Sequence, residues 1–160
     1  MQNLIETLSR ALKAKGIKLV TAESCTGGLL AAAITHKPGA SDIFDRGFIT
    51  YTNQSKMDLL HVAEVVLSSF GAVSAETAEA MAKGALQNSN AGLAVSITGI
   101  AGPDGGTDKK PVGLVFFGYA LKGGSSGSIE CQFEGNRQQI RSAAATKALE
   151  HLLTVLEPER

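Results

Sequence analysis

Glycine is concentrated at three points of the chain, and this placement constrains the fold more than any other feature of the sequence. Of the 160 residues 18 are glycine, and they cluster at 27–28, 99–106 and 123–124. Glycine takes positive φ angles freely and lets the backbone approach a neighbour closely. The first two clusters follow apolar runs of strand length, at residues 17–22 and 91–97. They therefore indicate tight loops at the ends of strands.

The rest of the chain alternates between helical and extended patterns. Apolar residues at helical spacing predict helices, with Gly16 and Ser74 as caps, over residues 2–15, 29–35, 54–61, 74–88 and 137–156. Besides the two runs above, we predict strands over 47–52, 111–121 and 128–133, the last two as an antiparallel hairpin. This order predicts an α/β fold: a three-layer α/β/α sandwich with a mixed central sheet that includes the C-terminal antiparallel hairpin, in a single domain over 1–160.

The charge balance excludes some classes of partner. Fifteen Lys and Arg residues offset fifteen Asp and Glu residues, so no overall positive field attracts nucleic acid or an anionic membrane. The two cysteines are too few for a disulfide scaffold, and the chain has neither a basic and apolar leader nor a long uncharged apolar run. We therefore expect a soluble cytoplasmic protein with no nucleic-acid partner and no membrane partner.

The loop after the first strand carries Ser24, Cys25 and Thr26 ahead of a glycine pair. Ligands of open α/β sheets gather at the carboxyl ends of strands, where helix N-termini favour negative charge. The spacing fits neither a phosphate-binding P-loop nor a G-x-S-x-G elbow. Three interpretations stay open: these residues hold a phosphate, Ser24 or less plausibly Cys25 is a nucleophile, or the hydroxyls only cap the helix.

A serine nucleophile needs a base, and Lys56 is the best-placed candidate. It follows the predicted strand that carries Tyr51 by a few residues, whereas His36, His61 and His151 do not adjoin a glycine cluster; for His61 and His151 we expect a surface or helix-end role. A partly buried lysine can lose its proton near neutral pH and act as a base. The alternative is a solvated lysine on a helix face.

Two further features could bind a ligand. The loop over residues 98–107 is rich in glycine, and its main-chain amides could hold a polar ligand, or the glycines could serve geometry alone. Arg137 and Arg141 are four residues apart at the start of the last helix, where they suit a phosphate or carboxylate but could equally be solvated. Cys25 and Cys131 lie far apart, and no histidine pair has helical spacing, so we expect no metal.

Several segments in the same order resemble one known family. They are Thr21–Gly28 (TAESCTGG), Gly47–Asn53 (GFITYTN) with Lys56, Gly71–Ser74 (GAVS), Ile97–Gly106 (ITGIAGPDGG), Lys110–Gly113 (KPVG), and Phe133–Arg137 (FEGNR) with Arg141. The chain resembles the CinA C-terminal domain family, the bacterial nicotinamide mononucleotide deamidases also termed PncC. Members often carry an additional N-terminal domain, and we expect this chain to be the standalone form.

The resemblance implies an amidohydrolase that converts nicotinamide mononucleotide into nicotinic acid mononucleotide and ammonia, a salvage step of pyridine nucleotide metabolism, with neither metal nor organic cofactor. It implies that Ser24 is the nucleophile, that Lys56 is its base, and that Tyr51 relays the proton or orients the pair. The alternative, in line with the competence and damage names of relatives, is a non-catalytic nucleotide-binding regulatory module.

The resemblance also implies a homodimer, and it suggests which residues bind the substrate. Arg141, with Arg137 as second candidate, is expected to hold the phosphate, and Asn53 or Asp104 the ribose. Main-chain amides of the two glycine loops are expected to stabilise the oxyanion or support the phosphate. The full expected set of substrate-binding residues is Cys25, Thr26, Gly27, Asn53, Thr98, Gly99, Gly102, Asp104, Gly105, Gly106, Arg137 and Arg141.

Overall fold

The computed structural model describes residues 1–157, so residues 158–160 of the predicted domain lie outside the described part. Five strands form one mixed sheet. The strands lie in the order β2-β1-β3-β4-β5. The strand β1 runs parallel to β2 and β3, whereas β3, β4 and β5 are antiparallel neighbours. The elements are α1 (Gln2–Lys15), β1 (Leu19–Glu23), α2 (Leu29–Ile34), a 3₁₀ turn (Ala40–Asp42), β2 (Phe44–Ile49), α3 (Asn53–Leu60), α4 (Glu64–Phe70), α5 (Ala75–Gln87), β3 (Leu93–Gly99), β4 (Leu114–Leu121), β5 (Ser126–Gln132) and α6 (Arg137–Leu156).

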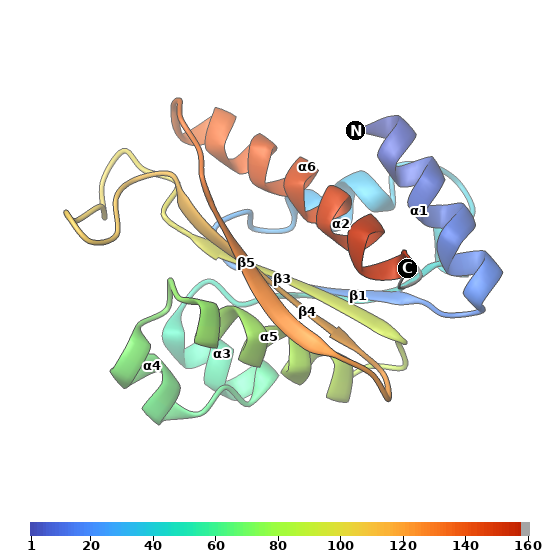
Figure 1. The fold of residues 1–160 in the computed structure, drawn as a ribbon, viewed down its shortest axis with the longest axis horizontal. Coiled ribbons are helices and arrows are strands. Elements are labelled where there is room, and N and C mark those ends of the chain that lie inside the picture. The colour runs from blue at the N-terminus through green and yellow to red at the C-terminus, as the bar shows by residue number, and fades with distance from the viewer. Residues whose placement is uncertain (158–160) are drawn as a thin grey trace.

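Helices cover both faces of this sheet. Helices α1, α2 and α6 lie on one face, and α3, α4 and α5 lie on the other (Figure 1). The predicted α/β sandwich with a mixed sheet and an antiparallel hairpin is therefore confirmed. No helix within residues 1–157 has the length and apolar character needed to cross a membrane.

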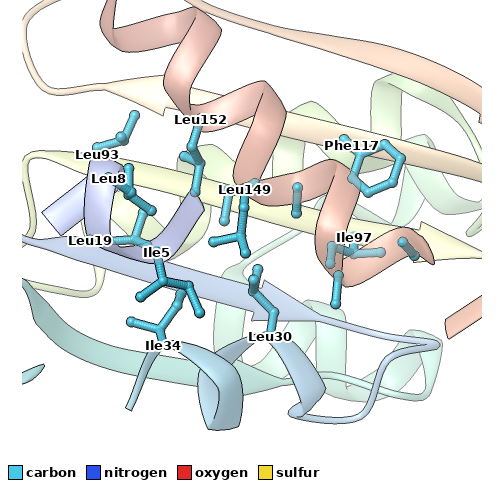
Figure 2. Packing of buried hydrophobic residues seen from close by; sticks show 14 of the residues in the cluster. Ile5, Leu8, Leu19, Leu30, Ile34, Leu93, Ile97, Phe117, Leu149 and Leu152 are labelled. Carbon is cyan, nitrogen blue, oxygen red and sulfur yellow. The ribbon is translucent and has the colours of Figure 1, made fainter. Parts of the chain in front are cut away.

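Two apolar clusters hold the layers together, one on each side of the sheet. The first joins α1, α2 and α6 to the sheet through residues such as Leu8, Leu30 and Leu149 (Figure 2). The second joins α3, α4 and α5 to the opposite face. On β1, Leu19 faces the first cluster and Val20 the second, as the alternation of side chains along a strand requires.

Local sequence signals explain where several helices begin and end. Gly16 ends α1 with a φ of 65°, a conformation that glycine adopts without steric cost. The Ser74 hydroxyl accepts a hydrogen bond from the Thr77 N–H at the start of α5, so the predicted cap is confirmed. Gly84 lies against the main chain of α3, since a Cβ at this position would be 1.9 Å from the Leu60 carbonyl oxygen.

The structure corrects one predicted strand, adds one helix and overturns the expected role of one histidine. The second strand is Phe44–Ile49 rather than 47–52, because an edge strand with partly exposed Asp45 and Arg46 carries no apolar run. Helix α4 was missed, because in its seven residues only Leu67 is buried and no helical periodicity develops. His151 is 7% exposed and packs edge-on against Tyr119, so the expected surface role was also wrong.

Candidate active site

The site lies where two parallel strands end. Strands β1 and β3 are paired in register from Leu19 to Glu23, so their carboxyl ends meet at one edge of the sheet, where ligands of open α/β sheets bind. Ser24 follows β1 directly, and β3 ends at Gly99. The two glycine loops singled out in the sequence therefore flank the same space.

Lys56 reaches this space from α3 and contacts Ser24. Its Nζ lies 3.0 Å from the Ser24 Oγ, 2.9 Å from the carbonyl oxygen of Thr50 and 3.5 Å from that of Tyr51. Thr52 fixes the start of α3 by accepting a hydrogen bond from the Ser55 N–H, and Ser55 in turn accepts one from the Thr52 N–H. The structure thus brings together the two side chains that the sequence analysis paired, although 32 positions separate them.

Burial changes the acid–base properties of two groups at the site, Lys56 and Cys25. The Lys56 side chain is 1% exposed, and desolvation of the ammonium lowers its pKa from 10.5 to about 8. Burial also raises the pKa of the Cys25 thiol to about 11, because desolvation disfavours the thiolate. At neutral pH the amine can accept a proton while the thiol stays protonated, which favours Ser24 over Cys25 as the nucleophile.

The turn that carries Ser24 is held by main-chain and side-chain hydrogen bonds. The Ser24 N–H donates to the Ile97 carbonyl of β3, and the Gly27 N–H donates to the Ser24 carbonyl. Gly27 and Gly28 have φ angles of 58° and 103°, which explains the glycine pair. The N–H groups of Cys25 and Thr26 donate to no main-chain acceptor within residues 1–157.

A cavity of about 260 Å³ opens over the Ser24–Lys56 pair. Ten of its lining residues belong to the expected site: Ser24, Cys25, Tyr51, Lys56, Thr98, Gly99, Gly102, Asp104, Gly105 and Arg137. Sequence reasoning missed the other four, which are Ala72, Val73, Ile100 and Ala101. These are small or apolar residues with no chemistry to single them out, although Ala72 and Val73 lie in the quoted GAVS segment and Ile100 and Ala101 in the quoted ITGIAGPDGG segment.

Five other expected residues lie outside this cavity, and one of them, Arg141, borders the hollow described next. Thr26 is buried and its hydroxyl donates to the Glu23 carboxylate, and Gly27 lies beneath the Arg141 guanidinium. Asn53 is the exposed first residue of α3. Gly106 lines a neighbouring hollow on the outside of the glycine-rich loop. The expected contact of Asn53 with the ribose has no support in the shape of the cavity.

The two arginines border a second hollow, of about 400 Å³, beside the first. Arg137 lines both spaces and donates to the Gly102 carbonyl and to the Tyr51 hydroxyl. Arg141 donates to the carbonyls of Cys25 and Thr26. A guanidinium carries five N–H groups, so each arginine keeps donors for a ligand.

Tyr51 does not have the arrangement that a proton relay requires. Its hydroxyl is hydrogen-bonded to Arg137, and within residues 1–157 it makes no hydrogen bond to Ser24 or Lys56. Of the two roles expected for Tyr51, relay therefore has no hydrogen bond to support it within residues 1–157. Orientation remains, because its main-chain carbonyl faces the Lys56 amine and its phenol holds Arg137.

Sequence reasoning also missed Glu23, which is 1% exposed. Its carboxylate accepts hydrogen bonds from the Thr26 hydroxyl and from the N–H groups of Leu30 and Ala31. The available signal was an acidic residue at the end of an apolar strand, directly before a glycine turn and a short helix. In the described part of the chain, no three His, Cys, Asp or Glu side chains are grouped so that they could hold a metal ion.

The fold and the site define an α/β protein with a buried serine and lysine in hydrogen-bond contact at the carboxyl edge of a mixed sheet. The chain belongs to the CinA C-terminal domain family, whose model matches residues 1–156.

Relatives of two lengths share this domain. The chain is 48% identical to nicotinamide-nucleotide amidohydrolase PncC of Enterobacter agglomerans, over 96% of this chain and 93% of that protein. It is 45% identical to PncC of Escherichia coli K12, over 95% and 92%. It is 52% identical to a competence-damage inducible protein of Caldicellulosiruptor saccharolyticus, over 94% of this chain but only 36% of that protein. The chain thus spans about a third of the longer relatives.

Solved structures of the family have the same fold. The competence/damage inducible protein CihA of Agrobacterium tumefaciens superposes with a TM-score of 0.91 at 44% identity, over 96% of both chains. A CinA superfamily protein of Escherichia coli superposes with a TM-score of 0.91 at 38% identity, over 96% of this chain and 88% of that one.

Proposed function

We propose that this protein is a nicotinamide-nucleotide amidohydrolase, which hydrolyses the carboxamide of nicotinamide mononucleotide to nicotinic acid mononucleotide and ammonia. The observation that carries the proposal is the 3.0 Å contact between the Ser24 Oγ and the amine of Lys56, whose pKa burial lowers to about 8. The identity to PncC proteins over more than nine-tenths of their length supports the same activity.

Acylation begins with proton transfer from the Ser24 hydroxyl to the neutral Lys56 amine. The Oγ attacks the carboxamide carbon, the C=O bond becomes a C–O⁻ single bond, and Lys56 becomes the ammonium. Lys56 then returns the proton to the leaving nitrogen, the C–N bond breaks and ammonia departs. A lysine with a pKa near neutral serves both steps, because it can accept and donate the proton at little cost.

Deacylation reverses these roles with water. Lys56, now neutral, takes a proton from water, and the hydroxide attacks the ester carbon on Ser24. The bond between Oγ and the acyl carbon breaks, Lys56 returns the proton to Oγ, and the carboxylic acid product leaves and loses its proton to water. No group other than the pair and water is needed for the proton balance.

Main-chain amides near Ser24 are suited to stabilise the oxyanion. The N–H groups of Cys25 and Thr26 follow the nucleophile directly and donate to no main-chain acceptor within residues 1–157. Donors placed where negative charge develops are worth about a hundred- to a thousandfold in rate each. We assign these two amides to the oxyanion, with the loop over 98–106 as the opposite wall of the cavity.

The phosphate of the substrate is assigned to the two arginines. Arg137 borders the catalytic cavity, and both Arg137 and Arg141 border the adjoining hollow. A substrate whose amide lies over Ser24 would place its phosphate in that hollow. Of the two residues expected to bind the ribose, only Asp104 is among the residues that line the cavity. We therefore assign contact with the ribose to Asp104 and not to Asn53.

We propose a homodimeric, cytoplasmic enzyme. The edge strand β2 ends at Ile49, which is 55% exposed, and Tyr51 is 56% exposed. Sheet edges with exposed apolar side chains are commonly covered by another chain. Light scattering after gel filtration tests the assembly, and a monomeric mass at micromolar concentration would contradict it.

Ammonia release from nicotinamide mononucleotide tests the activity. Purified wild type should turn over, whereas Ser24→Ala and Lys56→Ala should lose activity by at least about a hundredfold. Equal rates for all three would end the assignment of the pair. No turnover by any of them, combined with nucleotide binding in calorimetry, would favour the regulatory-module alternative.

A further inference from the structure

We propose that Glu23 is a positioning residue of the nucleophile turn. Its carboxylate fixes the end of β1 to the first turn of α2 and thereby sets the direction of the amides that follow Ser24. The inference rests on the proposed function, and it adds a residue that does not line the catalytic cavity.

The Glu23 carboxylate is buried, and within residues 1–157 every hydrogen bond it accepts comes from the segment that follows it. One oxygen, Oε1, accepts from the Thr26 hydroxyl at 2.7 Å and from the Leu30 N–H at 2.9 Å. The other, Oε2, accepts from the Ala31 N–H at 3.1 Å. The donors lie three, seven and eight residues along the chain. The carboxylate therefore closes a ring of main chain that contains Ser24, Cys25 and Thr26.

Glu23 also replaces the cap that α2 lacks. The residue before the helix is Gly28, which has no side chain and makes no cap hydrogen bond. The first N–H groups of a helix have no acceptor within the helix, and leaving them unpaired in a buried position is costly. Without the Glu23 carboxylate, the Leu30 and Ala31 amides would need other acceptors, and the helix start would have to move.

Such a movement would reach the proposed oxyanion donors. A peptide unit is planar, with its C=O and N–H pointing in opposite directions. Arg141 holds the carbonyls of Cys25 and Thr26, which aims the N–H of Thr26 away from the guanidinium. Glu23 holds the Thr26 side chain from within the fold. The peptide unit between Cys25 and Thr26 is thus held by Arg141 on one side and by Glu23 on the other. Loss of either contact would allow the Thr26 N–H to rotate.

A carboxyl group fits this task better than the amide of glutamine. Three donors converge on its two oxygens, and a carboxylate can accept all of them. In Glu23→Gln one oxygen still accepts from Thr26 and Leu30, but an NH₂ group faces the Ala31 N–H. The variant keeps the volume of the side chain and breaks one contact, so it separates the hydrogen bonds from the packing.

The test compares Glu23→Gln and Thr26→Val with Leu8→Ala, a truncation in the buried core on α1 that controls for lost stability. We expect kcat for nicotinamide mononucleotide to fall about tenfold or more in the first two variants. Their KM and the pH midpoint of the rate should stay within about twofold of wild type, because neither side chain lines the cavity or contacts Lys56. Leu8→Ala should lower the melting temperature and leave kcat unchanged.

Amide hydrogen exchange gives a readout that does not need the reaction. Exchange over residues 24–31 should be faster in Glu23→Gln than in wild type and unchanged in Leu8→Ala. A wild-type kcat in Glu23→Gln overturns the proposal. If wild type itself does not hydrolyse the nucleotide, the proposed function fails and the exchange decides: faster exchange supports the positioning role, and unchanged exchange overturns it.

Discussion

The rate of amide hydrolysis should depend on pH in a way that reports the burial of Lys56. With a pKa of about 8, about 9% of this amine is neutral at pH 7 and about 90% at pH 9. The value of kcat/KM should therefore rise about tenfold between these pH values and reach a plateau near pH 10. A solvent-exposed lysine with a pKa of 10.5 would give a rise of about a hundredfold with no plateau.

Initial rates of ammonia release at low substrate concentration, between pH 7 and 10.5, measure this profile. The second ionisation of a phosphate, with a pKa of about 6, is nearly complete over this range, so the substrate charge changes little. Lys56→Arg is the matched control, because its guanidinium stays charged at every pH used. Its activity should fall by about a hundred- to ten-thousandfold.

Three results would refute parts of this reasoning. A wild-type profile that is flat from pH 7 to 10.5 would show that the neutral Lys56 amine is not the limiting base. A climb of about a hundredfold between pH 7 and 9 without levelling would show that burial does not lower the pKa of the limiting base. If the Lys56→Arg variant were active and its pH profile kept the wild-type midpoint, the titration would belong to a group other than Lys56.

Further predictions concern stability and the neighbouring thiol. Because burial holds the pKa of Lys56 below its unfolded value, the unfolded chain binds more protons between about pH 8 and 10.5, and stability rises with pH across that window. Lys56→Met should therefore raise the free energy of unfolding at pH 7 by about 1–3 kcal/mol, with the gain lost near pH 10.5 in urea titrations. Cys25→Ser should keep kcat within about threefold, since a thiol with a pKa of about 11 is protonated at pH 7; a loss of turnover equal to that of Ser24→Ala would contradict this. Burial lowers the pKa of His151 below 6.5, so wild type should lose stability as pH falls from 6.5 through the folded-state pKa; His151→Phe should lose less between pH 7 and 5, and equal losses in urea titrations would show that His151 is not responsible.

The parts of the fold that depend on local signals were predictable. Gly16 ends α1 and Ser74 begins α5 where the sequence indicated. The strands β1 and β3 are mainly apolar and buried along almost their whole length, because each has neighbours on both sides and a helix layer on both faces. Helix α4 and the start of β2 were missed for the complementary reason. No residue of β2 and only Leu67 of α4 is buried, so neither segment carries the apolar pattern from which an element is predicted.

Within the site, the sequence allowed the residues with reactive side chains to be proposed, but not the residues that position them. Ser24 and Lys56 each followed a predicted strand and carried a reactive side chain, so their types and places were enough to nominate them. Glu23 was passed over, because its role exists only through the amides of a helix that begins six residues later. The competing hydrogen bonds of Tyr51 and Arg137 likewise become visible only when β2 and α6 are placed together.

The geometry of the serine and lysine follows from the parallel pairing of β1 with β2. Because these neighbours run in the same direction, the loops that leave their carboxyl ends emerge at the same edge of the sheet, one with Ser24 and the other with α3. Lys56 lies one turn into that helix, after the Thr52 cap. Side chains of a helix lean toward its N-terminus, so the amine points back past the cap to the Thr50 carbonyl and to Ser24. A lysine placed one turn later would lean over the helix itself, and the same sequence composition would then leave the serine without a base.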